Sequence, residues 1–114
     1  MCIRNLLAPV VAAGFLCTAA AHAAEGSVRI LQPAEGATLD SMAQNRLVYE
    51  VDPGPQGDHI HVYVDDREVG ILRQRKGNYA LETLAPGRHE LCVKVVNKAH
   101  TPIGLQKCVA VTVD

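Results

Sequence analysis

The sequence predicts an all-β domain over residues 24–114, an immunoglobulin-like or fibronectin-III-like β-sandwich of about seven strands. Short runs of alternating apolar and polar residues recur along this region, and Gly and Pro interrupt them at close spacing. Val, Ile and Leu dominate the apolar positions, and β-branched residues favour strands. No stretch has the periodicity of a helix. One apolar face and one polar face per strand therefore indicate two packed sheets.

The expected strands follow one another along the chain, and turn residues separate them. They span 27–32, 45–52, 59–65, 68–72, 78–84, 88–96 and 105–113. In the third strand, Ile60 and Val62 are expected to face the core, because alternate side chains point to opposite faces. His59 and His61 alternate with them and are therefore expected on the outer face.

Residues 1–23 have the pattern of a cleavable signal peptide. Arg4 is the only charge, a long apolar run follows it, and Ala-His-Ala at 21–23 fits the small-residue rule for cleavage. The run is short for a membrane span, which needs about 20 residues. Leu16 precedes Cys17 where a lipoprotein signal requires a small residue, which argues against lipidation. We expect a periplasmic or secreted mature chain without stable membrane insertion.

Charge argues against nucleic acid or an anionic membrane surface as a partner. The whole chain has 11 basic and 12 acidic residues, and removal of Arg4 with the signal peptide leaves ten basic ones and a net charge of −2. No basic patch is visible in the sequence, and such a patch is what these anionic partners require.

Cys92 and Cys108 are the two cysteines that remain after removal of the signal peptide. Each lies next to an inward-facing valine in its strand, so both are expected on the outer face. A hairpin centred near His100 places residue 92 opposite residue 108, where an antiparallel pair brings side chains close enough to bridge. We predict a Cys92–Cys108 disulfide in an oxidising compartment, with two free thiols as the alternative.

Histidines form the candidate functional site. His59 and His61 share one face of a strand, about 7 Å apart along it. In an immunoglobulin-like sandwich the third and sixth strands are antiparallel neighbours, so the loop after the sixth strand brings His100 to the same end and leaves His89 at the opposite end.

Imidazole suits both copper and zinc, so His59, His61 and His100 predict a Cu or Zn site, with Asp58 as a candidate fourth ligand. The alternative is that His59 and His61 are surface residues or donate hydrogen bonds to loop carbonyls. No other cofactor is indicated.

Catalytic patterns do not occur in the sequence. Ser27 and Ser41 are the only serines, and neither lies in a nucleophile-elbow pattern. No Gly-rich phosphate-binding loop is visible. The sequence therefore favours a non-enzymatic module that binds a protein partner, which it does not identify, through sheet edges or end loops. Copper or zinc binding is the alternative function.

Several segments resemble known exported bacterial domains. Residues 28–36 resemble the opening strand of bacterial immunoglobulin-like modules. Residues 57–65, 84–89 and 96–102 resemble a family of small exported domains of unknown function, often called DUF4399-like. The resemblance covers most of the mature chain and implies an exported immunoglobulin-like β-sandwich, but no activity. The cysteine pair departs from the family pattern.

Overall fold

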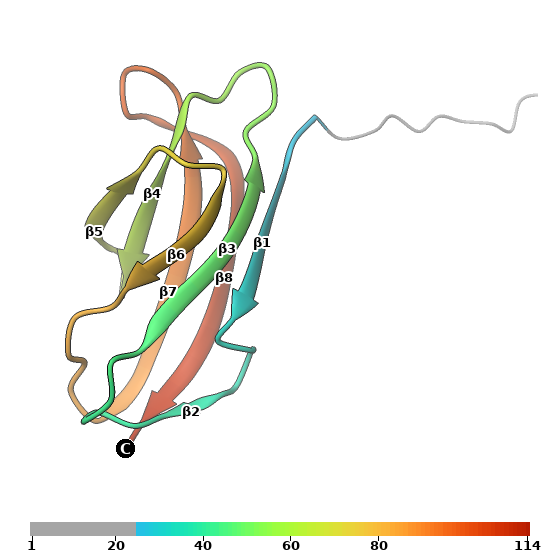
Figure 1. Cartoon of the computed structure of the whole chain (residues 1–114). Helices are drawn as coiled ribbons and strands as arrows, with labels where there is room; N and C mark the ends of the chain where they lie inside the picture. Colours follow the sequence, from blue (N-terminus) through green and yellow to red (C-terminus); the bar gives the residue numbers. More distant parts are fainter. Residues whose placement is uncertain (1–24) are drawn as a thin grey trace, which may run out of the picture.

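Two β-sheets packed face to face make up the domain (Figure 1). The structure, a computed structural model, describes residues 25–114, so the predicted signal peptide lies outside the described residues. Every regular element within 25–114 is a strand, which confirms the predicted all-β sandwich. No helix in this range is long and apolar enough to cross a membrane.

Eight strands occur in residues 25–114, and seven of them coincide with the predicted runs. They are β1 (Ser27–Gln32), β2 (Thr38–Leu39), β3 (Arg46–Asp52), β4 (His59–Val64), β5 (Arg67–Leu72), β6 (Lys76–Ala80), β7 (Gly87–Val96) and β8 (Pro102–Val113). The predicted run 78–84 was too long at its end, because the chain leaves the first sheet after Ala80 and crosses to β7 in the second. The two-residue strand β2 was not predicted.

Strand order places the candidate residues at one end of the larger sheet. The three-stranded sheet has the order β1-β3-β6, and the five-stranded sheet has the order β2-β8-β7-β4-β5. As predicted, β4 and β7 are antiparallel neighbours, with His59 opposite Val96. The start of β4 therefore lies beside the end of β7, where the loop to β8 begins.

The hydrophobic core lies between the two sheets. Ile60 and Val62 of β4 face it, with 2% and 0% of their surface exposed, as the alternation predicts. Burial of one such aliphatic side chain contributes roughly 1.5–3 kcal/mol. The other buried members are Leu47, Tyr49, Val51, Leu81, Leu91, Val93, Val95, Val109 and Val111. This core fixes the direction of every side chain on β4, including those of the candidate site.

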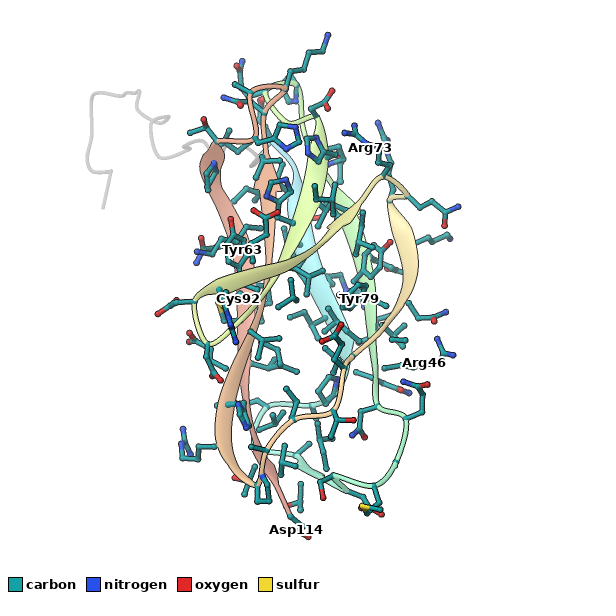
Figure 2. All side chains as sticks on the ribbon, turned by 90° about the vertical axis from the view of Figure 1, so that its left-hand side faces the viewer. Arg46, Tyr63, Arg73, Tyr79, Cys92 and Asp114 are labelled. Atoms are coloured by element: carbon teal, nitrogen blue, oxygen red, sulfur yellow. A yellow bond between two sulfur atoms is a disulfide. The ribbon has the colours of Figure 1, made fainter. Side chains whose placement is uncertain are left out.

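The predicted disulfide is confirmed. Cys92 of β7 lies opposite Cys108 of β8, and their Cα atoms are 4.1 Å apart. Tyr63 is the neighbour of Cys92 on β4, and Figure 2 shows both on the ribbon. The bridge closes a loop with a sequence separation of 16, which contributes about 3 kcal/mol in the chain-entropy model. It locks together the two strands that carry the loop with His100.

Candidate metal centre

His59 and His61 lie on the outer face of β4, but they are not surface residues. Only 3% of His59 and 2% of His61 is exposed, so the alternative of a solvent-facing pair is wrong. The loop between β7 and β8 explains this difference, because it folds over the sheet and places His100 against both rings. The ring centroid of His100 lies 4.6 Å from that of His59 and 5.2 Å from that of His61.

The conformation of this loop is set by Asn97. Its side-chain oxygen accepts hydrogen bonds from the backbone N–H groups of Ala99 and Thr101, at 2.9 and 3.1 Å. The backbone N–H of His100 donates to the carbonyl of Asn97, and His100 has a φ of 66°. A non-glycine residue in this left-handed region costs of order 1 kcal/mol. The residue that carries this conformational cost, His100, is the one that completes the histidine cluster.

Three ring nitrogens converge in what we call the imidazole triangle. Nε2 of His59 lies 3.1 Å from Nε2 of His61 and 3.2 Å from Nδ1 of His100. Nε2 of His61 lies 3.1 Å from the same Nδ1. The structure thus brings together all three histidines that the sequence singled out.

Asp58 fixes the tautomer of His59. The Nδ1–H group of His59 donates to Oδ2 of Asp58 at 2.8 Å, because a carboxylate only accepts. A neutral imidazole carries one N–H group, so Nε2 of His59 turns a lone pair toward the triangle. The hydrogen bond from His59 holds the pKa of Asp58 below its ordinary value. Asp58 therefore lies behind the ring of His59, on the side away from the triangle. The expectation that Asp58 is a fourth metal ligand was wrong.

Glu68 of β5 occupies the corresponding position behind His61. Its Oε1 lies 3.3 Å from Nδ1 of His61, and this buried nitrogen has no hydrogen-bond partner among the described residues. Burial lowers the pKa of His61, and the charge of Glu68 opposes that effect. Sequence reasoning did not assign Glu68 to the candidate site. The pairing of Glu68 with Tyr63, two residues from His61, was the signal that could have identified it.

The three contacts of the imidazole triangle cannot all be hydrogen bonds at once. Each of these nitrogens carries either one N–H or one lone pair, so at least one of the three contacts between neutral imidazoles joins two N–H groups or two lone pairs. Zn–N bonds are 2.0–2.1 Å long, so an ion bound to all three nitrogens makes N–metal–N angles of about 100°, near the tetrahedral value. The residues present therefore fit an ion of this class.

Other polar groups of the described chain do not form a comparable centre. Glu90, Cys92 and Cys108 also lie within 4.8 Å of one another, but the two sulfurs are joined in the disulfide and supply no thiolate. His89 lies at the opposite end, as predicted, where its Nδ1–H donates to Asp65 at 2.6 Å.

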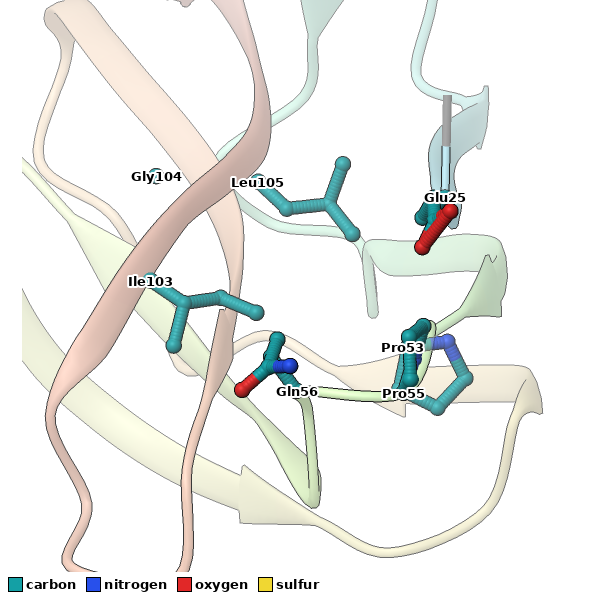
Figure 3. Close-up of a pocket in the computed structure, with 7 residues that line it drawn as sticks. All are labelled: Glu25, Pro53, Pro55, Gln56, Ile103, Gly104 and Leu105. Carbon is teal, nitrogen blue, oxygen red and sulfur yellow. The ribbon is translucent and has the colours of Figure 1, made fainter. Parts of the chain in front are cut away.

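A shallow hollow of about 470 Å³ contains none of the three histidines (Figure 3). Its lining comprises Glu25, Pro53, Pro55, Gln56, Ile103, Gly104 and Leu105. Glu25 is the only charged group among these lining residues, so this hollow offers no set of metal ligands.

Comparison with solved structures identifies the kind of sandwich. The fibronectin(III)-like modules of Clostridium thermocellum CbhA match with a TM-score of 0.63 and 15% identity, over 79% of this chain and 47% of theirs. The chain has a fibronectin-III-like fold. The extracellular domain of BT4673 from B. thetaiotaomicron matches with a TM-score of 0.57 and 12% identity, over 82% of this chain and 16% of that one. An engineered protein matches with a TM-score of 0.55 and 18% identity, over 79% and 20%.

These similarities concern the fold alone, because the identities are low and the chain spans less than half of each matched chain. No protein-family model and no curated protein matches the sequence.

Proposed function

We propose that the domain binds one divalent transition-metal ion, Cu(II) or Zn(II), through Nε2 of His59, Nε2 of His61 and Nδ1 of His100. The observation that supports this function is the imidazole triangle, with three nitrogens 3.1–3.2 Å apart. Carboxylates behind metal-binding histidines are a common feature of such sites, since they orient the ring and raise its basicity. The hydrogen bond from His59 to Asp58 supports this role, as does the 3.3 Å approach of Glu68 to Nδ1 of His61.

Burial of His59 and His61 lowers the stability of the fold unless a ligand binds their ring nitrogens. Burying a polar group without a matching hydrogen bond costs roughly 1–3 kcal/mol on the scale of protein mutations. Apolar residues at these positions would stabilise the covered face of β4 without that cost. Two buried imidazoles in a triangle whose three contacts cannot all be hydrogen bonds thus favour a ligand-binding role over a purely structural one.

The chemistry of the ligands narrows the choice of metal. Three nitrogen ligands suit zinc and copper, whereas calcium and magnesium take oxygen ligands. Affinity for divalent ions at a given nitrogen site rises to a maximum at copper, so we expect Cu(II) to bind more tightly than Zn(II) in vitro.

Titration calorimetry of the protein stripped of metal tests this function. We expect one ion per chain, and we expect His100→Gly to weaken binding by at least roughly 100-fold, since it removes a ligand. Glycine suits this position because the φ of His100 is 66°, so the loop keeps its conformation. The matched control is His89→Gln, which removes an imidazole at the other end and leaves binding unchanged. Equal affinities of His100→Gly and the unaltered protein exclude the site.

Binding of a protein partner stays a second candidate function. The fibronectin-III-like fold supports it, as does the edge strand β5, on which Val69 and Ile71 are 40% and 47% exposed. Exposed sheet edges accept an extended segment of another chain. Crosslinking of the exported protein in its own compartment tests this candidate, and recovery of no partner counts against it.

A further inference from the structure

We infer that the bound ion keeps one coordination position free of protein ligands and that this position takes a small anion, such as a carboxylate. The inference rests on the proposed metal binding and specifies what the site does with the metal.

The size of the imidazole triangle places the ion to one side of it. With sides of 3.1–3.2 Å, the centre of the triangle is about 1.8 Å from each nitrogen, which is shorter than a Zn–N or Cu–N bond of about 2.0 Å. The ion therefore lies about 1 Å out of the plane of the nitrogens. All three imidazoles then occupy one side of the ion, and the other side has no histidine.

The described chain supplies no fourth ligand for that side. Within residues 25–114, the three histidines form a group that no further histidine, cysteine or carboxylate joins within 4.8 Å. The carboxylates of Asp58 and Glu68 lie beside His59 and His61, but each faces the Nδ1 atom on the side of the imidazole ring away from the triangle. Zinc sites with three protein ligands hold water or a substrate in the fourth position, so an exogenous ligand is expected here.

Solvent reaches the surroundings of the site. His100 is exposed, although its two partners are buried. A hollow of about 410 Å³ lies between the loop that carries Asp58 and the loop that carries His100. Its lining includes Asn97, Lys98 and Ala99, directly before His100. None of the three histidines lines this hollow, but it brings solvent to the loop directly before the exposed ring of His100.

Charge favours an anion over a neutral ligand. The imidazoles are neutral ligands, so a divalent ion keeps its double positive charge. The charges of Asp58 and Glu68 are balanced by Arg73, whose Nη1 lies 3.6 Å from Asp58, and by Lys98 in the loop. The net charge of the loaded site is therefore positive, which attracts anions and does so most strongly at low ionic strength.

The experiment uses the protein loaded with Cu(II) and titrated with azide and with acetate. We expect each anion to change the absorption and electron paramagnetic resonance spectra of the copper saturably, with one anion per ion. Lys98→Gln is expected to weaken azide binding about two- to fivefold, as removal of one exposed charge does, and to leave copper uptake intact. Lys107→Gln on β8 is the matched control and leaves both unchanged.

The outcomes separate this inference from the proposed function. Copper uptake through the three histidines without any spectral change on addition of azide or acetate overturns the open position and keeps the metal site. Absence of copper uptake overturns both. Spectral change with equal azide affinity in Lys98→Gln, Lys107→Gln and the unaltered protein overturns the charge argument and thereby the selectivity for anions.

Discussion

Asp58 decides which nitrogen of His59 faces the imidazole triangle. Its carboxylate accepts the proton of Nδ1, which leaves the lone pair of Nε2 for a metal ion. An asparagine in the same place offers an N–H group to Nδ1 as readily as an oxygen, so the tautomer is no longer fixed. In the proposed metal site, Asp58 thus positions a ligand and is not itself one.

We expect Asp58→Asn to weaken Zn(II) and Cu(II) binding by about 10- to 100-fold, the usual effect of losing a carboxylate behind a metal-bound histidine. Asp66→Asn makes the same change of charge in the turn after β4, at the far end of that strand, and should leave metal binding unchanged. Competition titration with a coloured chelator measures both. Equal losses of metal affinity in the two variants would show that the effect comes from the net charge of the protein and not from the hydrogen bond to His59.

Residue types and strand phase identify the three histidines and the disulfide, but not the environment of each. The period of a strand decides the face on which a side chain lies. It says nothing of what covers that face, so the burial of His59 and His61 follows only from the loop conformation that Asn97 sets. The alternation of residues also does not predict the side-chain rotamer that turns Asp58 away from the centre of the imidazole triangle.

At the scale of strands, a second histidine ties β4 to β7 at the end far from the triangle. Nδ1–H of His89 donates to Oδ2 of Asp65, directly after β4, and Nε2–H donates to the carbonyl of Ala85. Since both nitrogens donate, the ring is stabilised in its charged form. The hydrogen bonds to Asp65 and Ala85 raise the pKa of His89 above 6.5.

Asp65 shows the opposite shift. Burial raises its pKa, but hydrogen bonds from the backbone N–H of Glu90 and from His89 outweigh this and lower the pKa below 3.8. The sign of each contribution to stability follows from linkage. The part from His89 is fully present below the unfolded value of 6.5 and is lost as pH rises through the folded pKa. The part from Asp65 is present above 3.8 and is lost as pH falls below it.

The pair therefore stabilises the fold most between the two ordinary pKa values. We expect His89→Gln to lower the free energy of unfolding by up to roughly 1 kcal/mol at about pH 5.5, because half of the Asp65 side chain is exposed and solvent screens the pair. Above the raised pKa of His89, the difference in unfolding free energy between the variant and the unaltered protein should shrink. Urea denaturation with a chelator present, at about pH 5.5 and 8.5, measures this. A difference that is the same at both pH values contradicts the assignment.

Strand pairing was the most predictable level of the structure. Seven alternating runs gave seven strands, and their order placed β4 beside β7. The strand β2 was missed because two residues are too few to show alternation, and its parallel pairing with β8 depends on where the chain returns. The end of β6 was missed because the crossing between sheets is decided by packing.

At the scale of the whole domain, the proposed metal ion would join segments that only the folded chain brings together. His59 and His61 belong to β4, and His100 lies about 40 positions further along, in the loop after β7. The unfolded chain does not hold the three ring nitrogens within 3.2 Å of one another, so the proposed ion would bind the folded state selectively. Metal binding is thereby linked to the stability of the sandwich.

Zinc should therefore raise the melting temperature of the protein in a concentration-dependent way. At a free Zn(II) concentration 100 times the Kd, the added stability is about 2.7 kcal/mol. A domain of this size gains about 4–8 °C per kcal/mol, so the expected shift is roughly 10–20 °C. Circular dichroism at increasing Zn(II) measures the shift in the unaltered protein and in His100→Gly, which keeps the two strand histidines. The disulfide is intact in both proteins, so it does not contribute to a difference between them. Equal shifts of the melting temperature would mean that the ion binds away from the imidazole triangle. A shift confined to the unaltered protein would mean that binding requires all three histidine rings.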